Sequence, residues 1–562
     1  MCEQAIRAGE RTVRAVLCAG VFLFVVQTVV ADFVLVENGQ PASVIVLADT
    51  PAPAARQAAD ALRDVVAQMS GAELPVVAES DYRKQADPVF VGASKAAAEA
   101  SVRIAQDADA GDRYVIRATD HVLALVGNDA GRLRGTAYAV YDLLERLGCG
   151  WFGPAPLWQV IPKKTTLAVP ALDLDERPAF RDRTMSSLMG LDRALLDAWR
   201  LGGDGISHAH AFDRLIPRAA YADEHPDYFG DVQPCLTHPD VIGIITRQFR
   251  EELDATEGIV SFSLSANDAL GFCDCARCRA VGNASALNLE FANRVARNLA
   301  QTHPGRYLLT FYAFWGTHDA PFPAVKAEPG VCVMQVNEGN HLHPWCEPER
   351  PDISQIIDRN NTRERIAFDG WSKTGAVLGI YEWWIPACDH PDWQRVPWYS
   401  GETALRNLRF WQAHGVKYLC YQTGMEEGDG FPLRWPLYYV GARGMWNPRL
   451  TAEQIMREAC DKLYGPAAEP MRAYYRLLEQ AASDCTALCK SWRLPSPPLV
   501  YPPEIESKAA ALLDQAAAVA ADTPVRARVA QERALWQAAR DLLADRRENP
   551  KGAEPSKANP GM

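Results

Sequence analysis

The chain has 562 residues, of which 48% are hydrophobic and 23% charged, and its formal net charge is −12. A chain of this length exceeds one hydrophobic core, so we expect roughly two to four domains. The acidic balance excludes nucleic acid as the expected partner, because phosphate binding requires a face rich in lysine and arginine. Neutral sugars make no demand on charge, so the composition neither favours nor opposes them.

Residues 1–31 have the pattern of a secretory signal peptide. Arg7, Arg11 and Arg14 precede an apolar run of about 16 residues, which is short for a membrane span of roughly 20. Val29-Val30-Ala31 then offers the small residues that a signal peptidase reads. We therefore predict a secreted or periplasmic protein with no membrane span in the mature chain. An uncleaved N-terminal anchor is the alternative.

Residues 32–172 alternate short apolar strands with amphipathic helices, which predicts an N-terminal α/β domain. The strands are expected at 33–36, 44–47, 89–91, 114–117 and 122–126, and the helices at 54–70 and 134–147. The proline-rich stretch at 151–170 is interpreted as the linker out of this domain.

Residues 173–450 repeat a strand, a polar tip and a helix, which predicts a parallel sheet covered by helices. The strands are expected at 181–185, 259–265, 307–314, 331–336, 377–384 and 416–422. Polar and aromatic residues follow the strands without a glycine-rich phosphate loop, so the pattern favours a (β/α)8-type TIM barrel over a doubly wound sheet. No strand can be assigned between Gly202 and Pro234, which leaves a gap in the predicted barrel.

The remainder of the chain is predicted to be helical and then disordered. Helices are expected at 452–464, 469–488, 504–521 and 526–546, which together form a C-terminal helical domain over 451–546. Residues 547–562 are rich in proline, glycine and lysine and are predicted to be a disordered tail.

Four residues at predicted strand tips are candidates for catalysis of glycosidic bond cleavage. This reaction needs a carboxylic acid for the leaving oxygen and a second group for the anomeric centre. Asp268 supplies an acid directly beside the amide of Asn267, and Glu338 and Glu382 are further tip carboxylates. The structural alternatives are an Asx turn at Asn267-Asp268 and buried hydrogen bonding at the two glutamates.

Aromatic and polar residues near the same tips are candidates for substrate binding. Ten of the fifteen tryptophans lie between Trp315 and Trp446, and an indole face can pack against the C–H face of a sugar ring. Packing in the core is the competing interpretation of these tryptophans. The candidate binding residues are His208, His210, Trp315, Asn337, Tyr381, Trp384 and Trp398. His208 and His210 have no third ligand at metal-binding spacing, so we predict no catalytic metal and no cofactor.

Cys273, Cys275 and Cys278 form the most conspicuous cluster in the sequence. With a distant fourth ligand these three thiols could hold zinc, but export to an oxidising compartment favours disulfides. A Cys273–Cys278 bridge would brace the loop after Asp268. Catalysis by a thiol is not expected, because no nearby histidine would activate it.

Residues 264–278, Leu-Ser-Ala-Asn-Asp-Ala-Leu-Gly-Phe-Cys-Asp-Cys-Ala-Arg-Cys, resemble the signature of a bacterial group catalogued as domain of unknown function 4838. Part of that group is classed as glycoside hydrolase family 163. The segments at 135–145, 148–152, 379–384 and 463–471 also fit. The resemblance implies a barrel preceded by a domain similar to those of hexosaminidases and α-glucuronidases. It also implies activity on β-N-acetylglucosaminides of complex N-glycans, with Asn267 orienting the acetamido group and Asp268 as general acid and base.

We therefore predict an exported glycoside hydrolase whose partner is an oligosaccharide or a glycoprotein glycan. The leading hypothesis is a retaining, substrate-assisted mechanism. An inverting, uronidase-like enzyme that uses Asp268, Glu338 and Glu382 is the second hypothesis, and Arg395 or Arg434 in the cleft would support it. A non-catalytic glycan-binding protein on a degenerate barrel is the third. The sequence does not determine the oligomeric state.

Overall fold

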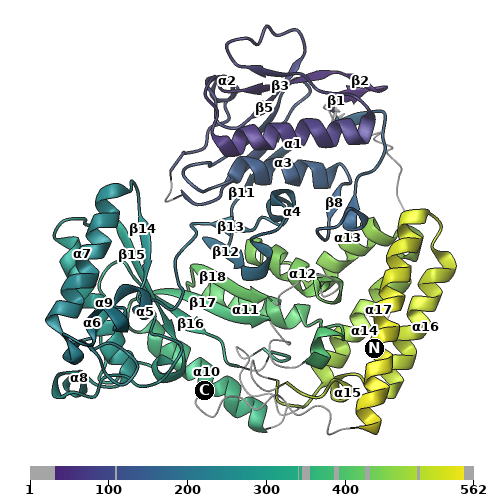
Figure 1. The fold of residues 1–562 in the computed structure, drawn as a ribbon. Helices are drawn as coiled ribbons and strands as arrows, with labels where there is room; N and C mark the ends of the chain where they lie inside the picture. The colour runs from purple at the N-terminus through teal and green to yellow at the C-terminus, as the bar shows by residue number, and fades with distance from the viewer. Residues whose placement is uncertain are drawn as a thin grey trace, which may run out of the picture.

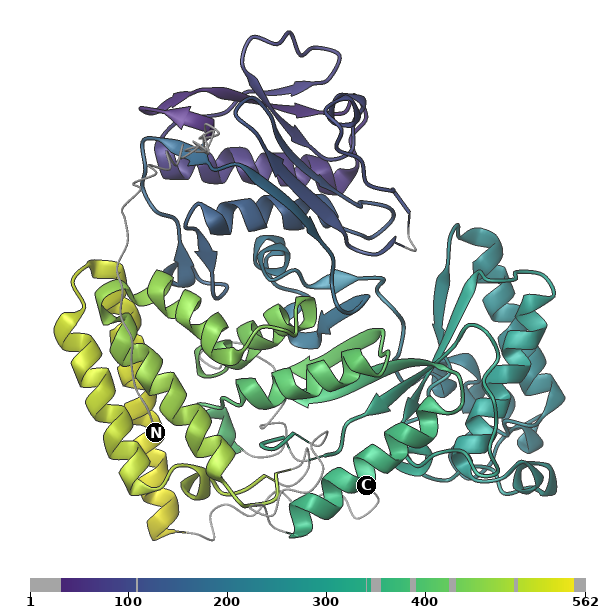
Figure 2. The ribbon, with the colours of Figure 1, turned by 180° about the vertical axis from the view of Figure 1, so that it is seen from behind.

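The computed structural model describes residues 32–107, 110–339, 341–344, 355–384, 391–423, 431–489 and 494–549. The predicted signal peptide at 1–31 and residues 550–562 of the predicted tail lie outside these ranges. The described chain is a mixed α/β structure with an N-terminal sheet domain, a central curved sheet and a C-terminal group of helices (Figures 1 and 2). No helix in these ranges is both long and apolar enough to cross a membrane.

The N-terminal domain is built on a six-stranded mixed sheet whose two long helices lie on one face, while a short helix packs on the other. Its strand order is β11 (Leu172–Glu176), β6 (Tyr114–Ala118), β7 (Leu123–Gly127), β5 (Asp87–Val91), β3 (Ser43–Leu47) and β4 (Val76–Ala78). α1 (Pro53–Ser70) and α3 (Gly135–Arg146) lie between this sheet and the rest of the molecule (Figure 1). The smaller elements are β1 (Phe33–Glu37), β2 (Gln40–Pro41), α2 (Lys95–Glu99), β8 (Gly150–Trp151), β9 (Gln159–Val160) and β10 (Leu167–Val169).

The central domain contains a seven-stranded sheet, and six of its strands run parallel. The order is β13 (Gly202–Gly203), β12 (Asp182–Met185), β18 (Tyr418–Thr423), β17 (Val377–Trp384), β16 (Val331–Val336), β15 (Tyr307–Ala313) and β14 (Val260–Ser263). Only β13 is antiparallel to its neighbour. All six predicted strands are present. β18, the last strand of this sheet along the chain, pairs with β12, the first, as it would in a barrel.

The described residues form an open half-barrel sheet and do not complete the predicted (β/α)8 barrel. The edges are β13 and β14, and the segment from Gly202 to Ala211 crosses the space between them. This segment pairs with β14 through a single parallel bridge between His210 and Ser265. In addition, the hydroxyl of Ser261 accepts from the N–H of Ser207, and the hydroxyl of Ser263 donates to the carbonyl oxygen of Ala209. Gly202, Gly203 and Gly205 all have positive φ, which interrupts an extended strand and leaves the gap without a full ladder.

Side chains of the curved sheet alternate between two environments, as the strand period of two requires. On the outer face, Leu309, Val333 and Ile380 join the cores formed with the helices. On the inner face, Cys332 and Met334 belong to a separate small cluster with Leu308, Tyr418 and Cys420. The inner face therefore combines this apolar cluster with buried hydroxyl groups such as those of Ser263 and Thr310, and the polar residues described below lie at the carboxyl ends of its strands.

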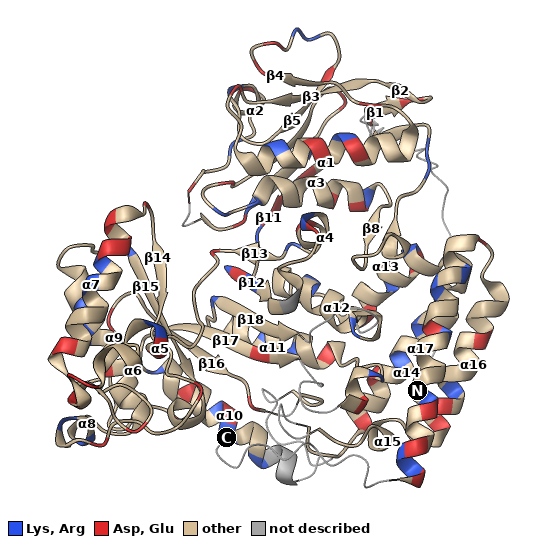
Figure 3. Cartoon of the chain, viewed as in Figure 1, with Lys and Arg blue, Asp and Glu red and all other residues tan. Residues whose placement is uncertain are grey.

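Helices cover the outer face of the curved sheet. The long ones are α7 (Pro239–Ala255), α9 (Ala284–Ala300), α10 (Gln355–Ser372), α11 (Gly401–Ala413) and α12 (Trp435–Trp446). The short helices α4 (Arg193–Ala198), α5 (Phe212–Leu215), α6 (Arg218–Tyr221) and α8 (Ala276–Val281) lie in the connecting segments. In α12, a Cβ atom on Gly441 would lie 2.0 Å from the ring of Trp384, so only glycine permits this close packing. Acidic and basic residues are interspersed along α7 and the C-terminal helices (Figure 3).

The C-terminal region consists of packed helices, as predicted. They are α13 (Ala452–Tyr464), α14 (Ala468–Asp484), α15 (Pro497–Val500), α16 (Pro503–Val519) and α17 (Thr523–Glu548). Arg547 and Glu548, which the sequence assigned to the tail, complete α17. Between these helices, the buried carboxylate of Glu532 accepts hydrogen bonds from the side chains of Tyr475 and Trp435.

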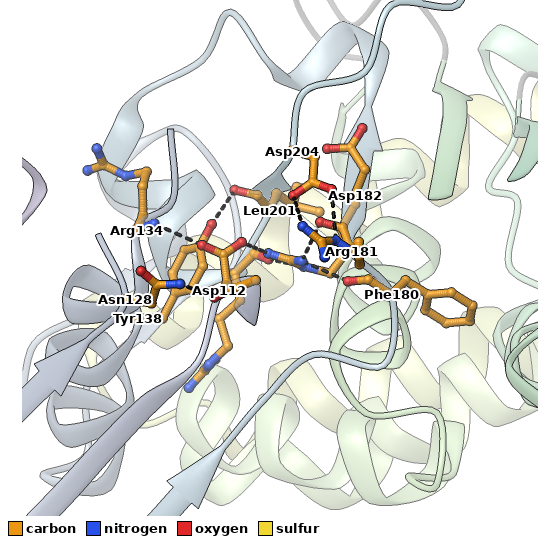
Figure 4. Close-up of polar contacts among 12 residues, drawn as sticks. Asp112, Asn128, Arg134, Tyr138, Phe180, Arg181, Asp182, Leu201 and Asp204 are labelled. Atoms are coloured by element: carbon orange, nitrogen blue, oxygen red, sulfur yellow. Dashed lines mark hydrogen bonds and ion pairs between the residues drawn. The ribbon is translucent and has the colours of Figure 1, made fainter. Parts of the chain in front are cut away.

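A buried ion pair joins the N-terminal domain to the first strand of the curved sheet (Figure 4). Arg183 of β12 and Asp112 are both 0% exposed, and their side chains lie 2.7 Å apart. Asp112 also accepts a hydrogen bond from the backbone N–H of Arg134, and Arg183 donates to the carbonyl oxygens of Phe180 and Arg200. Because each charge has several partners, the pair fixes the N-terminal domain against the sheet that carries the candidate site.

Candidate active site

A hollow lies at the carboxyl ends of β14 and β15, where the loops of a barrel would form an active site. It is narrow, with about 10 Å³ available to the centres of water-sized molecules, so it holds about one water in this conformation. The lining residues are His210, Ala266, Asn267, Ala269, Phe272, Tyr312, Phe314, Trp315, Gly316 and Thr317. Three of the predicted site residues, Asn267, His210 and Trp315, therefore meet at one place.

Aromatic side chains extend the wall of this hollow along the inner face of the sheet. Tyr312 of β15 packs edge-on against Tyr381 of β17 at 5.2 Å between ring centroids, and Tyr381 packs edge-on against Trp383 at 5.5 Å. The rings of His208 and His210 lie 5.9 and 5.3 Å from Tyr312. The predicted residues His208 and Tyr381 thus belong to the same aromatic surface.

The tip at Asn267-Asp268 is a tight turn held by surrounding side chains. The N–H of Ala269 donates to the carbonyl oxygen of Asn267 at 2.6 Å, which places Asp268 at the apex of a three-residue turn. Gln233, which is fully buried, accepts from the N–H of Asn267 and donates to the carbonyl oxygens of Asn267 and Ala269. One glutamine side chain thus fixes the backbone on both sides of Asp268.

The two side chains of this tip have different environments. The amide of Asn267 accepts from the backbone N–H of Asp213 at 3.0 Å and donates to the carboxylate of Asp213 at 2.7 Å. These bonds leave one N–H of the Asn267 amide for another acceptor. Asp268 is exposed, and its carboxylate has no hydrogen bond or ion pair with the residues that the structure describes. Asp268 itself is not among the residues that line the hollow, but its neighbours Asn267 and Ala269 are, so its exposed carboxylate is accessible to a ligand beside the hollow.

His208 contributes a neutral ring to the aromatic surface. Its Nδ1 lies 2.8 Å from the hydroxyl of Tyr312. Burial lowers the pKa of His208 to about 4, because a charged imidazolium would lose hydration here. Burial also raises the pKa of Tyr312 well above its usual value. Both groups are therefore uncharged at neutral pH and can form hydrogen bonds without placing a charge in the wall.

Glu382 does not face the hollow. It alternates with Tyr381 and Trp383 on β17 and so shares the outer face with Ile380. Its buried carboxylate accepts from the side-chain amide of Asn337 at 2.6 Å and from the N–H of Trp383 at 2.9 Å. His341 lies 3.3 Å away. Glu382 and Asn337 thus satisfy one another within the protein, as the structural alternative expected, and their catalytic and sugar-binding roles stay predictions.

The other glutamate and two tryptophans have distinct positions. Glu338 is partly exposed and follows β16 by two residues, near the carboxyl ends of the strands. Trp384 is 7% exposed and packs against Tyr421, while Trp398 is 4% exposed and packs against Trp393. The prediction that Trp384 and Trp398 are sugar platforms is corrected, because their rings belong to the hydrophobic core.

The family described as Domain of unknown function (DUF4838) matches residues 154–476. The chain belongs to this family. The matched range contains the whole candidate site, from His208 to the residues that end β18. The predicted resemblance is confirmed, and it covers more than half of the DUF4838 chain. No curated protein matches the chain in sequence.

Three solved structures resemble this chain to different extents. A family GH115 4-O-methyl-α-glucuronidase with specificity for decorated arabinogalactans, BtGH115A, has a TM-score of 0.59 at 13% identity, over 91% of this chain and 73% of its own. The N-acetyl-β-hexosaminidase of Streptomyces plicatus has a TM-score of 0.40 at 11% identity, over 76% and 91%. CpGH84D has a TM-score of 0.44 at 9% identity, over 95% of each chain. The match to BtGH115A shows that the DUF4838 protein shares its fold.

Several residues of the site escaped the sequence analysis of this DUF4838 protein. Gln233 and Asp213 precede Asn267 by 34 and 54 residues and lie in the region where no element could be assigned. The sequence analysis placed Tyr312 and Phe314 in a strand without assigning them to the site. Because successive side chains of a strand point to opposite faces, the two share the face opposite to Leu309 and Phe311 of the core, which could have identified them. Arg434 was expected to support a uronate site. It is buried and donates to the carbonyl oxygens of Val396 and Trp393.

Proposed function

We propose that this protein is a glycoside hydrolase that cleaves β-N-acetylglucosaminides of complex glycans. The observation that carries the proposal is the position of Asp268, whose available carboxylate stands on a clamped turn between two residues that line an aromatic hollow. A carboxyl group held at such a rim can protonate a glycosidic oxygen, and the aromatic wall can pack against a pyranose. The fold shared with a solved glucuronidase supports the same class of reaction.

The mechanism that we propose is retaining and substrate-assisted. Asp268 gives its proton to the leaving oxygen while the acetamido oxygen of the substrate attacks the anomeric carbon. Water then opens the resulting oxazolinium ring as Asp268 takes a proton back, which returns the carboxyl group to its starting state. Asn267 supports this role because one N–H of its amide stays available beside the hollow. Glu382 takes no part, since its carboxylate is bonded within the protein.

An inverting reaction is the second candidate because Glu338 is partly exposed near the same strand ends. Continued alternation beyond β16 would place Glu338 on the inner face with Met334 and Val336. In that case Asp268 would act as the acid and Glu338 as the base. The burial of Arg434 removes one expected anchor for a uronate, so a neutral sugar is favoured for either mechanism.

The test compares Asp268→Asn with Asp223→Asn, an isosteric change at an exposed aspartate after α6 whose sequence neighbours do not line the hollow. The substrates are aryl N-acetyl-β-glucosaminides and glycoprotein N-glycans. Loss of an acid–base group is expected to lower kcat by about 10²- to 10⁴-fold, and the control should keep its activity. Unchanged turnover in Asp268→Asn would remove Asp268 from the mechanism. Glycan binding by a wild-type protein without hydrolysis would show a binding protein instead.

The stereochemistry of the first product separates the two mechanisms. NMR during early turnover should show the β-anomer of N-acetylglucosamine if the substrate assists. An α-anomer would indicate inversion and would direct the same measurement to Glu338→Gln. Substrates whose acetamido group is replaced by a hydroxyl should react much more slowly only in the retaining mechanism, because they lack the attacking oxygen.

A further inference from the structure

Four cysteines converge beside the candidate active site. Cys273, Cys275 and Cys278 come from the loop after Asp268 and the start of α8, and Cys235 comes from the loop before α7. The four sulfur atoms all lie within 4.8 Å of one another. The sequence pointed to the first three, and the fold supplies the fourth ligand that a metal site would need.

The sulfur distances match a tetrahedral metal site. The Cys235 sulfur lies 3.7 Å from that of Cys278 and 3.9 Å from that of Cys275. A tetrahedron with zinc–sulfur bonds of about 2.3 Å has edges of roughly 3.8 Å. A disulfide would require about 2.05 Å between two sulfur atoms. All ten cysteines that the structure describes are free thiols, so the disulfides favoured from the expected compartment are not observed.

The surroundings of the cluster suit thiolate ligands. The N–H of Arg279 donates to the carbonyl oxygen of Cys275, so the first turn of α8 begins at this ligand and carries Cys278 beside it. The positively charged guanidinium of Arg277 lies near Cys235, Cys275 and Cys278. Thr237 lies 3.1 Å from the sulfur of Cys278 through its hydroxyl. These contacts offset the negative charge that four thiolates would bring.

The two loops are also shaped to bring these ligands together. A Cβ atom on Gly230 would lie 2.7 Å from the Cα atom of Cys273, so glycine is required for this approach of the two backbones. The N–H groups of Val232 and Gln233 both donate to the carbonyl oxygen of Gly271. The backbone therefore holds the cysteine loops in register independently of any ion.

We propose that Cys235, Cys273, Cys275 and Cys278 bind a structural zinc ion that fixes the loop carrying Asp268. Four thiolates in a tetrahedral arrangement select zinc among the common divalent cations, because soft sulfur ligands disfavour calcium and magnesium. Binding releases the thiol protons, and four protein ligands leave no position for a substrate, so the ion supports structure and takes no part in the reaction.

The link to the candidate site runs through Gln233. This residue precedes the ligand Cys235 by two positions, and its side chain holds the backbone on both sides of Asp268. Phe272, which lines the hollow, directly precedes the ligand Cys273. Loss of zinc is therefore expected to loosen both the acid-bearing turn and one wall of the hollow.

The decisive experiment measures metal in the purified full chain by inductively coupled plasma mass spectrometry. About one zinc per chain is expected in the wild type, and Cys235→Ser and Cys273→Ser should each lose most of it. Cys485→Ser is the matched control, because this buried cysteine at the end of α14 lies outside the cluster. Zinc absent from the wild type, or retained in both cluster variants, would overturn the proposal, as would iron in its place.

Thiol chemistry on the wild type keeps the test independent of whether the variants fold. Alkylation in denaturant with a chelator and without reductant should modify all four cluster cysteines, while the native zinc-loaded protein should protect them. Cluster cysteines that react only after reduction would show disulfides and overturn the proposal. Zinc content and alkylation do not depend on catalysis, so failure of the proposed glycosidase activity would leave this result unchanged.

Discussion

Gln233 and Asn267 exchange two hydrogen bonds: Gln233 Oε1 accepts from the backbone N–H of Asn267 at 2.9 Å, and Gln233 Nε2 donates to its carbonyl oxygen at 3.0 Å. Gln233 is 0% exposed, so water cannot replace these bonds. A buried side chain from one loop thereby dictates the conformation of the exposed tip on another.

Gln233→Ala is expected to lower kcat more than tenfold while the protein stays folded. The change leaves buried backbone groups of the tip without their partner, at a cost of about 1–3 kcal/mol in unfolding free energy. Asp268 would then sample orientations unsuited to proton transfer, so kcat should fall more than KM rises. Gln248→Ala, which removes one partly buried bond to the carbonyl oxygen of Leu215, is the control. Full activity in Gln233→Ala would contradict a positioning role.

Asp112→Ala is expected to destabilise the protein by about 3–5 kcal/mol, because it leaves the buried guanidinium of Arg183 without its counter-charge. Urea denaturation followed by tryptophan fluorescence measures this loss. Asp175→Ala removes an ion pair with Arg113 whose side chains are 47% and 30% exposed, and it should cost less than about 1 kcal/mol. Similar losses of unfolding free energy in the two variants would show that burial does not increase the contribution of the Asp112–Arg183 pair to stability.

The stability of the protein should fall as the pH decreases from 6.5 to 4, partly because of His208. Its pKa is lowered to about 4 by burial, so in this window the unfolded chain binds a proton that the folded chain does not. The contribution is up to about 3 kcal/mol and is fully present above pH 6.5. His208→Gln should show a weaker pH dependence in denaturant titrations. His121→Gln, at a side chain that is 76% exposed, should retain the wild-type profile.

Glu532 should have the opposite effect. Burial raises its pKa to about 7, so the folded chain holds a proton that the unfolded chain loses between pH 4.5 and 7. Its contribution to stability is present below pH 4.5 and decreases as the pH rises to 7. Glu532→Gln keeps an acceptor for Tyr475 without the charge, and its Tm should exceed that of the wild type at pH 8.5. Glu504→Gln, at an exposed side chain, is the control and should change Tm little. An unchanged Tm of Glu532→Gln at pH 8.5 would contradict the destabilising effect of a charged Glu532.

The sequence determined the elements wherever a periodic apolar pattern was strong. The strands β16 and β17 and the helix α13 have the predicted bounds, because runs of buried apolar residues and a capping threonine define them locally. The closure of the sheet was not determined in this way. Positive φ at Gly202, Gly203 and Gly205 depends on the contacts of that segment with β12 and β14, which no local pattern encodes.

The same distinction applies to the residues of the site. The sequence by itself identified Asn267, Asp268 and the three clustered cysteines, since each signal lies within a few neighbouring residues. Only the tertiary structure brought Gln233 and Cys235 to them, turned Glu382 away from the hollow and buried Trp384 and Trp398. Side-chain direction and long-range proximity follow from the packing of the whole sheet and its helices, so they arise only when the chain has folded.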